Sequence, residues 1–174
     1  MNQGLIHIYC GDGKGKTTAA LGLLLRALGR GKKAVFCQFL KSDDSGERRA
    51  LEAFANVTLT PCPKTIRFVF QMNEEEKRAA AEDCLRTFRD AVRLSLAGCE
   101  LLVLDEAFGA VSTGLLKKDE LLSFLRSKPR ELEVVLTGRD PGAEFLELAD
   151  YISHIEKRKH PFDRGCAARE GIEY

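Results

Sequence analysis

A glycine-rich loop between two apolar patterns constrains this chain more than any other feature. The loop spans residues 11–18 and reads Gly-Asp-Gly-Lys-Gly-Lys-Thr-Thr. Residues 5–10 before it are β-branched, aliphatic and aromatic, as in a buried strand, and residues 16–30 contain helix formers with an apolar stripe. A glycine-rich turn that joins a strand to a helix is the arrangement in which many α/β folds bind phosphate groups.

The residue types in the loop predict how a nucleoside triphosphate and its Mg²⁺ would bind. Glycines let the backbone N–H groups converge on an oxyanion, the Lys16 side chain supplies a mobile positive charge, and the Thr17 hydroxyl can ligate Mg²⁺. The usual motif has another glycine at the position of Cys10. The alternative is a glycine-rich turn without a ligand. The predicted nucleotide-binding residues of the loop are Gly11, Asp12, Gly13, Lys14, Gly15, Lys16, Thr17 and Thr18.

Strand and helix patterns alternate along the rest of the chain. Further strands are expected at residues 34–40, 101–104, 132–136 and 151–155, and further helices at 74–97, 118–127 and 141–149. This alternation predicts a three-layer α/β domain with a mostly parallel central sheet. Together with the phosphate loop, this pattern predicts the P-loop NTPase (RecA-like) form of that fold. A length of 174 residues fits one domain over residues 1–174. Residues 56–73 are the least regular stretch, which favours a functional loop there.

Two polar motifs follow predicted strands. Asp105 and Glu106 end an apolar run, where carboxylates hold Mg²⁺ or its water in phosphate-loop proteins, so Thr17, Asp105 and Glu106 are the predicted metal ligands. The alternative for Asp105 is a helix N-cap. Arg139 follows another strand, where ligands of open α/β sheets bind, and is predicted to contact a phosphate. Its alternative partner is the neighbouring Asp140.

Composition excludes several classes of protein and partner. The 27 basic residues nearly balance the 26 acidic ones, so the chain has no general nucleic-acid-binding surface charge. The six cysteines are scattered without a paired motif, which predicts free thiols in a reducing cytoplasm. No apolar run approaches the roughly 20 residues of a membrane span, and the amino terminus has no export signal. We therefore expect a cytoplasmic protein.

Taken in order and spacing, the motifs resemble one enzyme family. They are the loop at 11–18, Gln-Phe-Leu-Lys at 38–41, Gly-Glu at 46–47, Leu-Asp-Glu at 104–106, Thr-Gly-Arg at 137–139, Lys-His-Pro-Phe at 159–162 and the ending Gly-Ile-Glu-Tyr. The chain resembles the phosphate-loop corrinoid adenosyltransferases, which act on cob(I)yrinic acid a,c-diamide or cob(I)alamin. The resemblance covers nearly the whole chain and includes the shortened loop.

The resemblance implies an enzyme of adenosylcobalamin biosynthesis or salvage. It would move the 5′-deoxyadenosyl group of ATP to the Co(I) of a corrinoid and release triphosphate, with Mg²⁺ as cofactor. An electron donor such as a reduced flavoprotein and a homodimeric assembly are implied as well. Because negative charge develops on the departing triphosphate, Lys16 is expected to act on that group.

The resemblance also implies that aromatic side chains remove the lower axial ligand of the cobalt. The matching residues here are Phe68 and Phe70, where the family often has a Trp in the second position and this chain has none. The alternative is that an alternating Phe-Val-Phe belongs to a plain strand. Two other functions stay open: a small kinase or ATPase that uses the same loop, and a nucleotide-binding module without catalysis.

Overall fold

The computed structural model describes residues 3–41, 43–62 and 69–173, and a parallel sheet lies at its centre. All of its strand pairs are parallel, and the order across the sheet is β3-β2-β4-β5-β1-β6. The strands are β1 (Ile6–Cys10), β2 (Ala34–Gln38), β3 (Val57–Leu59), β4 (Leu101–Asp105), β5 (Glu133–Thr137) and β6 (Tyr151–His154). Strand β5 separates the loop-bearing β1 from the acidic β4, which is the RecA-like order.

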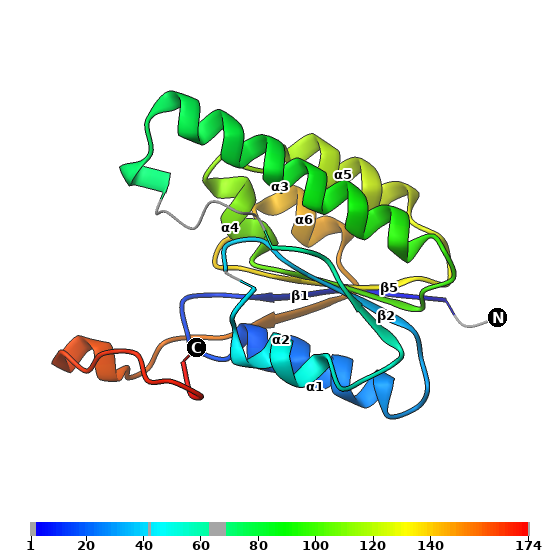
Figure 1. The fold of residues 1–174 in the computed structure, drawn as a ribbon, viewed down its shortest axis with the longest axis horizontal. Coiled ribbons are helices and arrows are strands. Elements are labelled where there is room, and N and C mark those ends of the chain that lie inside the picture. The colour runs from blue at the N-terminus through cyan, green and yellow to red at the C-terminus, as the bar shows by residue number, and fades with distance from the viewer. Residues whose placement is uncertain (1–2, 42, 63–68, 174) are drawn as a thin grey trace.

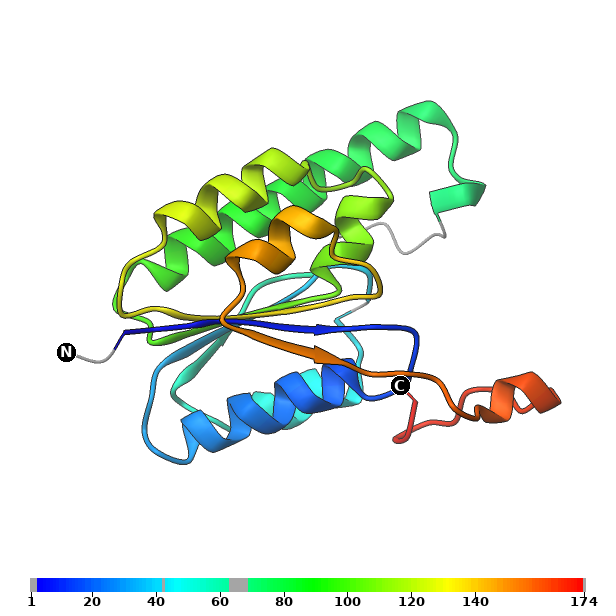
Figure 2. The same ribbon diagram turned by 180° about the vertical axis from the view of Figure 1, so that it is seen from behind.

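Helices cover both faces of this sheet, as Figures 1 and 2 show. Helices α1 (Lys16–Leu28) and α2 (Gly46–Leu51) lie on one face. The other face carries α3 (Glu74–Ser95), α4 (Ala107–Ser112), α5 (Lys118–Ser127) and α6 (Ala143–Leu148). Two short 3-10 helices complete the elements, η1 (Val69–Gln71) and η2 (Pro161–Arg164). The predicted three-layer α/β fold is confirmed.

The central strands supply the core of both layers. Strand β4 is buried along its whole length between β2 and β5, as its continuous apolar sequence predicts. Because successive side chains point to opposite faces, Phe36 and Val103 pack in the cluster that contains Leu24 of α1. Leu102 and Leu104 instead pack in the cluster that contains Phe88 of α3. The site-bearing ends of the strands are therefore held by two apolar layers.

The elements that differ from the sequence expectation are short. Residues 56–73 include β3, which pairs with β2 at the edge of the sheet, although the sequence indicated an irregular stretch. Helices α2 and α4 were not predicted, because six residues are too few to show a helical period. Helix α3, by contrast, begins at the predicted residue, where Asn73 and Glu76 form a reciprocal capping box.

Because the strands are parallel, the segments that follow them meet along one edge of the sheet. The phosphate loop after β1, Lys41 after β2, Glu106 after β4 and Arg139 after β5 all lie there. The C-terminal segment returns to this edge beyond η2, as the red end of the ribbon in Figure 1 shows. Within the described ranges, no helix is both long and apolar enough to cross a bilayer.

Candidate active site

The phosphate loop is packed against the backbone that follows β6. The N–H of Gly13 donates to the carbonyl of Ile155 at 2.8 Å, and the N–H of Gly11 donates to the carbonyl of Arg139 at 2.8 Å. A Cβ atom on Gly11 would lie 2.4 Å from the Ile155 oxygen, and one on Gly13 would lie 2.8 Å from it. These approaches are too close for any side chain, so the two glycines are required by packing.

Helix α1 begins as an anion-binding helix does. Its N-cap is Gly15, which has a positive φ of 119° and provides no side-chain cap, and its first turn contains no acidic residue. The first N–H groups of the helix and its positive end are thus left for an anion. The ammonium group of Lys16 donates to the Gly13 carbonyl at 2.8 Å, within the loop that it serves.

Asp105 is fully buried at the end of β4 and is the acceptor at the centre of a hydrogen-bond network. Its Oδ1 accepts from the hydroxyls of Thr17 at 2.8 Å and Thr137 at 2.7 Å. Its Oδ2 accepts from the Gln38 amide at 3.0 Å, across the register that pairs Gln38 with Asp105. The predicted partners Thr17 and Asp105 are therefore in direct contact. Asp105 caps no helix, since the N-cap of α4 is Glu106.

Glu106 has an unusual backbone and a perturbed carboxyl group. Its φ of 59° lies in the left-handed region, which is unfavourable for a residue other than glycine. Such strained conformations often occur at active sites. The Glu106 N–H donates to the Thr137 hydroxyl at 2.9 Å, which holds this conformation. Burial and then the neighbouring Asp105 raise the pKa of Glu106, while Lys16 opposes that shift.

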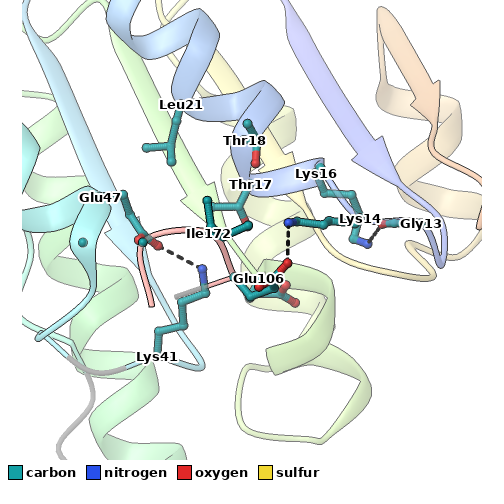
Figure 3. Close-up of a pocket in the computed structure, with 14 residues that line it drawn as sticks. Gly13, Lys14, Lys16, Thr17, Thr18, Leu21, Lys41, Glu47, Glu106 and Ile172 are labelled. Atoms are coloured by element: carbon teal, nitrogen blue, oxygen red, sulfur yellow. Dashed lines mark hydrogen bonds and ion pairs between the residues drawn. The ribbon is translucent and has the colours of Figure 1, made fainter. Parts of the chain in front are cut away.

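A cavity of about 610 Å³ lies over the loop, and Figure 3 shows the side chains around it. The lining includes seven predicted site residues: Gly13, Lys14, Gly15, Lys16, Thr17, Thr18 and Glu106. The other predicted residues of this edge lie beside it. Asp105 is buried behind Thr17, and the Asp12 carboxylate accepts from the Lys157 N–H at 2.9 Å. Arg139 is exposed, and its positive charge, like those of Lys16 and Lys41, opposes the rise in the pKa of Glu106 without reversing it.

Four further polar residues at this edge belong to motifs that carry the family resemblance, but the sequence alone predicted no role for them in the site. Gln38 and Thr137 hold Asp105, Lys41 pairs with Glu47 at 2.9 Å, and all four were missed as site residues. Their positions carried a signal, because three of them stand at or just after the carboxyl ends of β2 and β5. The C-terminal residues 171–173 also line the cavity, and no local pattern predicted that.

The oxygen ligands at the loop fit Mg²⁺. Among the described residues, no group of three or more His, Cys, Asp or Glu side chains is arranged to hold a metal by itself. The Thr17 hydroxyl and the Asp105 carboxylate are 2.8 Å apart, and Glu106 follows directly. Mg²⁺ typically takes one or two protein oxygens and completes its shell with water and substrate phosphates. The residues present match that sparse requirement.

Of the two predicted aromatic residues, Phe68 lies outside the described residues. Phe70 belongs to η1, so the backbone at Val69–Gln71 is a 3-10 helix and the plain-strand alternative is wrong for these three residues. Helix η1 directly precedes α3 in the chain, and Met72 between them is buried in the core. The backbone that carries Phe70 is thus anchored to the layer of α3.

The sequence and the fold of this chain are similar to those of known proteins. A family model described as "ATP:corrinoid adenosyltransferase BtuR/CobO/CobP" matches residues 2–174. The corrinoid adenosyltransferase of Escherichia coli K12 is 34% identical over 179 residues, which cover 99% of this chain and 86% of that protein. Corrinoid adenosyltransferase CobA of Salmonella typhimurium is 34% identical over 180 residues, with the same coverage. Among solved structures, EssC (ATPases 2 and 3) from Geobacillus thermodenitrificans aligns with a TM-score of 0.54 over 97% of this chain and 35% of that one. Because the two sequences are only 14% identical, this likeness supports a shared fold and nothing about function.

Proposed function

The chain belongs to the ATP:corrinoid adenosyltransferase family, and from this premise we propose that it transfers the 5′-deoxyadenosyl group of ATP to the Co(I) of a reduced corrinoid. The cobalt supplies the electron pair that forms the new Co–C bond. The bond between C5′ and its oxygen breaks, and its electron pair leaves with inorganic triphosphate. Negative charge thus develops on the triphosphate, which the protein must stabilise.

The observation that carries this proposal is the contact of Thr17 with Asp105 beneath a cavity lined by the loop and Lys16. The backbone N–H groups at the start of α1 bind phosphate oxygens, and Lys16 exchanges its bond to the Gly13 carbonyl for one to the triphosphate. Thr17 and Glu106, with Asp105 behind Thr17, would hold Mg²⁺. When bound, this ion supplies positive charge at the triphosphate.

The products distinguish this reaction from phosphoryl transfer. The protein is incubated with ATP, Mg²⁺ and chemically reduced cob(I)alamin or cobinamide, while the corrinoid spectrum is followed and the nucleotide products are separated. An adenosylated corrinoid together with triphosphate supports the proposal. Formation of ADP indicates a kinase or ATPase, and ATP binding without turnover indicates a binding module.

A pair of lysine variants tests the role of Lys16 in the site. Lys16→Ala is expected to abolish turnover, because the charge nearest the leaving group is lost. Lys32→Ala is the control, because Lys32 forms an ion pair with Glu100 at 3.3 Å and does not line the cavity. Equal activity of the two variants would refute the role given to Lys16.

Phe68 and Phe70 are proposed to displace the lower ligand of the corrinoid. Co(II) with an axial ligand is hard to reduce, so loss of these aromatic groups should matter most before Co(I) has formed. Replacing both by Ala should therefore slow the reaction that starts from Co(II) far more than the reaction that starts from pre-reduced Co(I). An equal loss in both assays would reject this assignment.

The finer identity of the substrates and partners is also part of the proposal. Cob(I)yrinic acid a,c-diamide, cobinamide and cobalamin are the proposed acceptors, and a reduced flavoprotein is the proposed electron donor. The cysteines of the described residues are free thiols, which supports a reducing cytoplasm. A homodimer is proposed from the family, and sedimentation of the purified protein tests it.

A further inference from the structure

A second cationic group faces the phosphate loop from the other side of the cavity. Lys41 follows β2 and Glu47 stands in the first turn of α2, and both line the same cavity as Lys16 and Thr17. Figure 3 shows the Lys41–Glu47 pair on one side of the site and the loop lysines on the other. Neither residue has a part in the mechanism described above.

The contacts of Lys41 fix its place near the metal-binding residues. Its ammonium nitrogen lies 2.9 Å from Glu47 Oε1 and 3.9 Å from Asp105 Oδ2, which is beyond hydrogen-bond range. Glu47 is itself held, since its Oε1 also accepts from the Gln38 amide at 2.8 Å. Gln38 donates to Asp105 as well, so one network joins Lys41 to the centre of the site.

The charge of Lys41 is maintained despite its partial burial. Two carboxylates stabilise the ammonium group in this position, Glu47 at 2.9 Å and Asp105 at 3.9 Å. Its side chain is 32% exposed, against 15% for Glu47, so the cation is the more accessible member of the pair. An ammonium group has three protons to donate, and the Glu47 contact uses one.

The carboxylates at this edge create the need for a second cation. Glu106 and Glu47 line the cavity proposed to hold the triphosphate, and Asp105 is buried behind Thr17. Lys16 stands on the loop side, so repulsion from the Glu47 side would remain if Lys41 were absent. We propose that Lys41 is a second triphosphate-binding residue, which contacts the phosphates opposite the loop, and that Glu47 is the positioning residue that holds its ammonium group. This inference rests on the proposed function.

The test measures binding of inorganic triphosphate with Mg²⁺ by titration calorimetry. Lys41→Met should raise the dissociation constant roughly ten- to a hundredfold, the size expected for a lost charge-assisted hydrogen bond. Lys41→Gln should lose as much, because it keeps a polar partner for Glu47 and removes only the charge. Lys32→Met is the matched control and should bind like wild type, since Lys32 pairs with a carboxylate away from the cavity.

Two further readouts separate a binding role from a structural one. The difference between wild type and Lys41→Met should shrink as salt is added, which a packing defect would not do. Glu47→Gln should weaken triphosphate binding in the wild-type background, because the Lys41 ammonium group loses its anchor. In the Lys41→Met background it should not weaken binding further, because there it removes a carboxylate that no cation offsets.

If Lys41→Gln binds triphosphate as tightly as wild type, the proposal is overturned. Should Lys41→Met fail to fold, the Lys41→Gln result is sufficient to test it. A salt-independent loss would overturn it as well. Product analysis on the wild type distinguishes failure of this proposal from failure of the proposed function. If the wild type forms adenosylated corrinoid and triphosphate while the Lys41 variants bind triphosphate normally, only the role of Lys41 is rejected. ADP as product rejects the proposed function, whatever the variants bind.

Discussion

Lys14 in the phosphate loop forms an ion pair with Glu173 near the C-terminus, 159 residues away, at 2.9 Å. The Glu173 carboxylate also accepts from the guanidinium of Arg169 at 3.1 Å. These bonds, those from Arg169 foremost and that from Lys14 next, lower the pKa of Glu173 to about 2. Glu173 is therefore ionised at any working pH and brings a fixed negative charge to the nucleotide cavity.

The first prediction concerns this charge. Glu173→Gln should bind inorganic triphosphate more tightly, because a carboxylate beside the loop repels the anion and occupies Lys14. The pair is partly exposed, with 45% of the Lys14 side chain accessible, so the gain should be roughly two- to fivefold at low salt. Calorimetry at two salt concentrations measures it, and the gain should fall as salt is added.

Glu170→Gln provides the control for this change. Glu170 is an exposed carboxylate of the same segment and does not line the cavity, so its variant should bind triphosphate like wild type. Weaker binding by Glu173→Gln would show the opposite role, in which the carboxylate holds Lys14 in its productive position.

The second prediction concerns the buried hydroxyl of Thr137. It donates to Asp105 Oδ1 and accepts from the Glu106 N–H, so Thr137→Val leaves both of those groups short of a partner. The free energy of unfolding should fall by about 1–3 kcal/mol. Urea unfolding measures this loss, and turnover should fall too, because Glu106 loses the contact that holds its left-handed backbone.

Thr137→Ser should restore most of the stability, since it keeps the hydroxyl. Thr113→Val is the matched control: the Thr113 hydroxyl is exposed and bonds only to carbonyls of its own helix, so its loss should cost much less. Equal losses in Thr137→Val and Thr113→Val would contradict the role of the buried network.

The sequence could predict the parts of the site that depend on local chain geometry. The loop at residues 11–18 and the acid after β4 follow from a strand, a turn and a helix in succession, and parallel strands bring such ends together. The contact of Thr17 with Asp105 is a consequence of that rule.

Other parts depend on long-range packing, which one sequence does not display. Gly13 must be glycine because the backbone of Ile155 passes beside it, and this approach joins segments far apart in the chain. The Lys14–Glu173 pair is of the same kind, since an exposed tail has no periodicity that fixes its path. Lys41 and Glu47 belong to a loop and a six-residue helix, where sequence patterns are weakest.

The third prediction concerns the ionisation of Glu106. Its pKa is raised above the usual 4.5, mainly by burial, so the folded state disfavours the charged form. The stability that the protonated group contributes is present below its usual pKa and is lost as the pH rises through the raised value. Glu106→Gln, which mimics the neutral form, should therefore be more stable than wild type at about pH 7 and closer to it at about pH 4.

Thermal unfolding at the two pH values measures this difference, and Glu52→Gln, at an exposed site, should show no such trend. Activity should move the other way. Loss of the Glu106 carboxylate should lower Mg²⁺-dependent turnover roughly ten- to a hundredfold. A variant that is less stable than wild type at neutral pH would contradict the unfavourable ionisation assigned to Glu106.

The last prediction compares two glycines of the same strand-loop-helix unit. A Cβ on Gly13 would lie 2.8 Å from backbone atoms of Ile155 and Glu156, which cannot move aside as a flexible side chain would. Gly13→Ala should therefore cost about 1–3 kcal/mol of stability and shift the loop, so that triphosphate binding is lost.

Gly22 lies inside α1, where a Cβ would meet nothing within 4 Å. Gly22→Ala should gain about 0.5–1 kcal/mol from helix propensity and keep full binding. Urea unfolding and calorimetry on both variants provide the comparison, and normal triphosphate binding by Gly13→Ala would show that the loop functions without its close approach to the segment after β6.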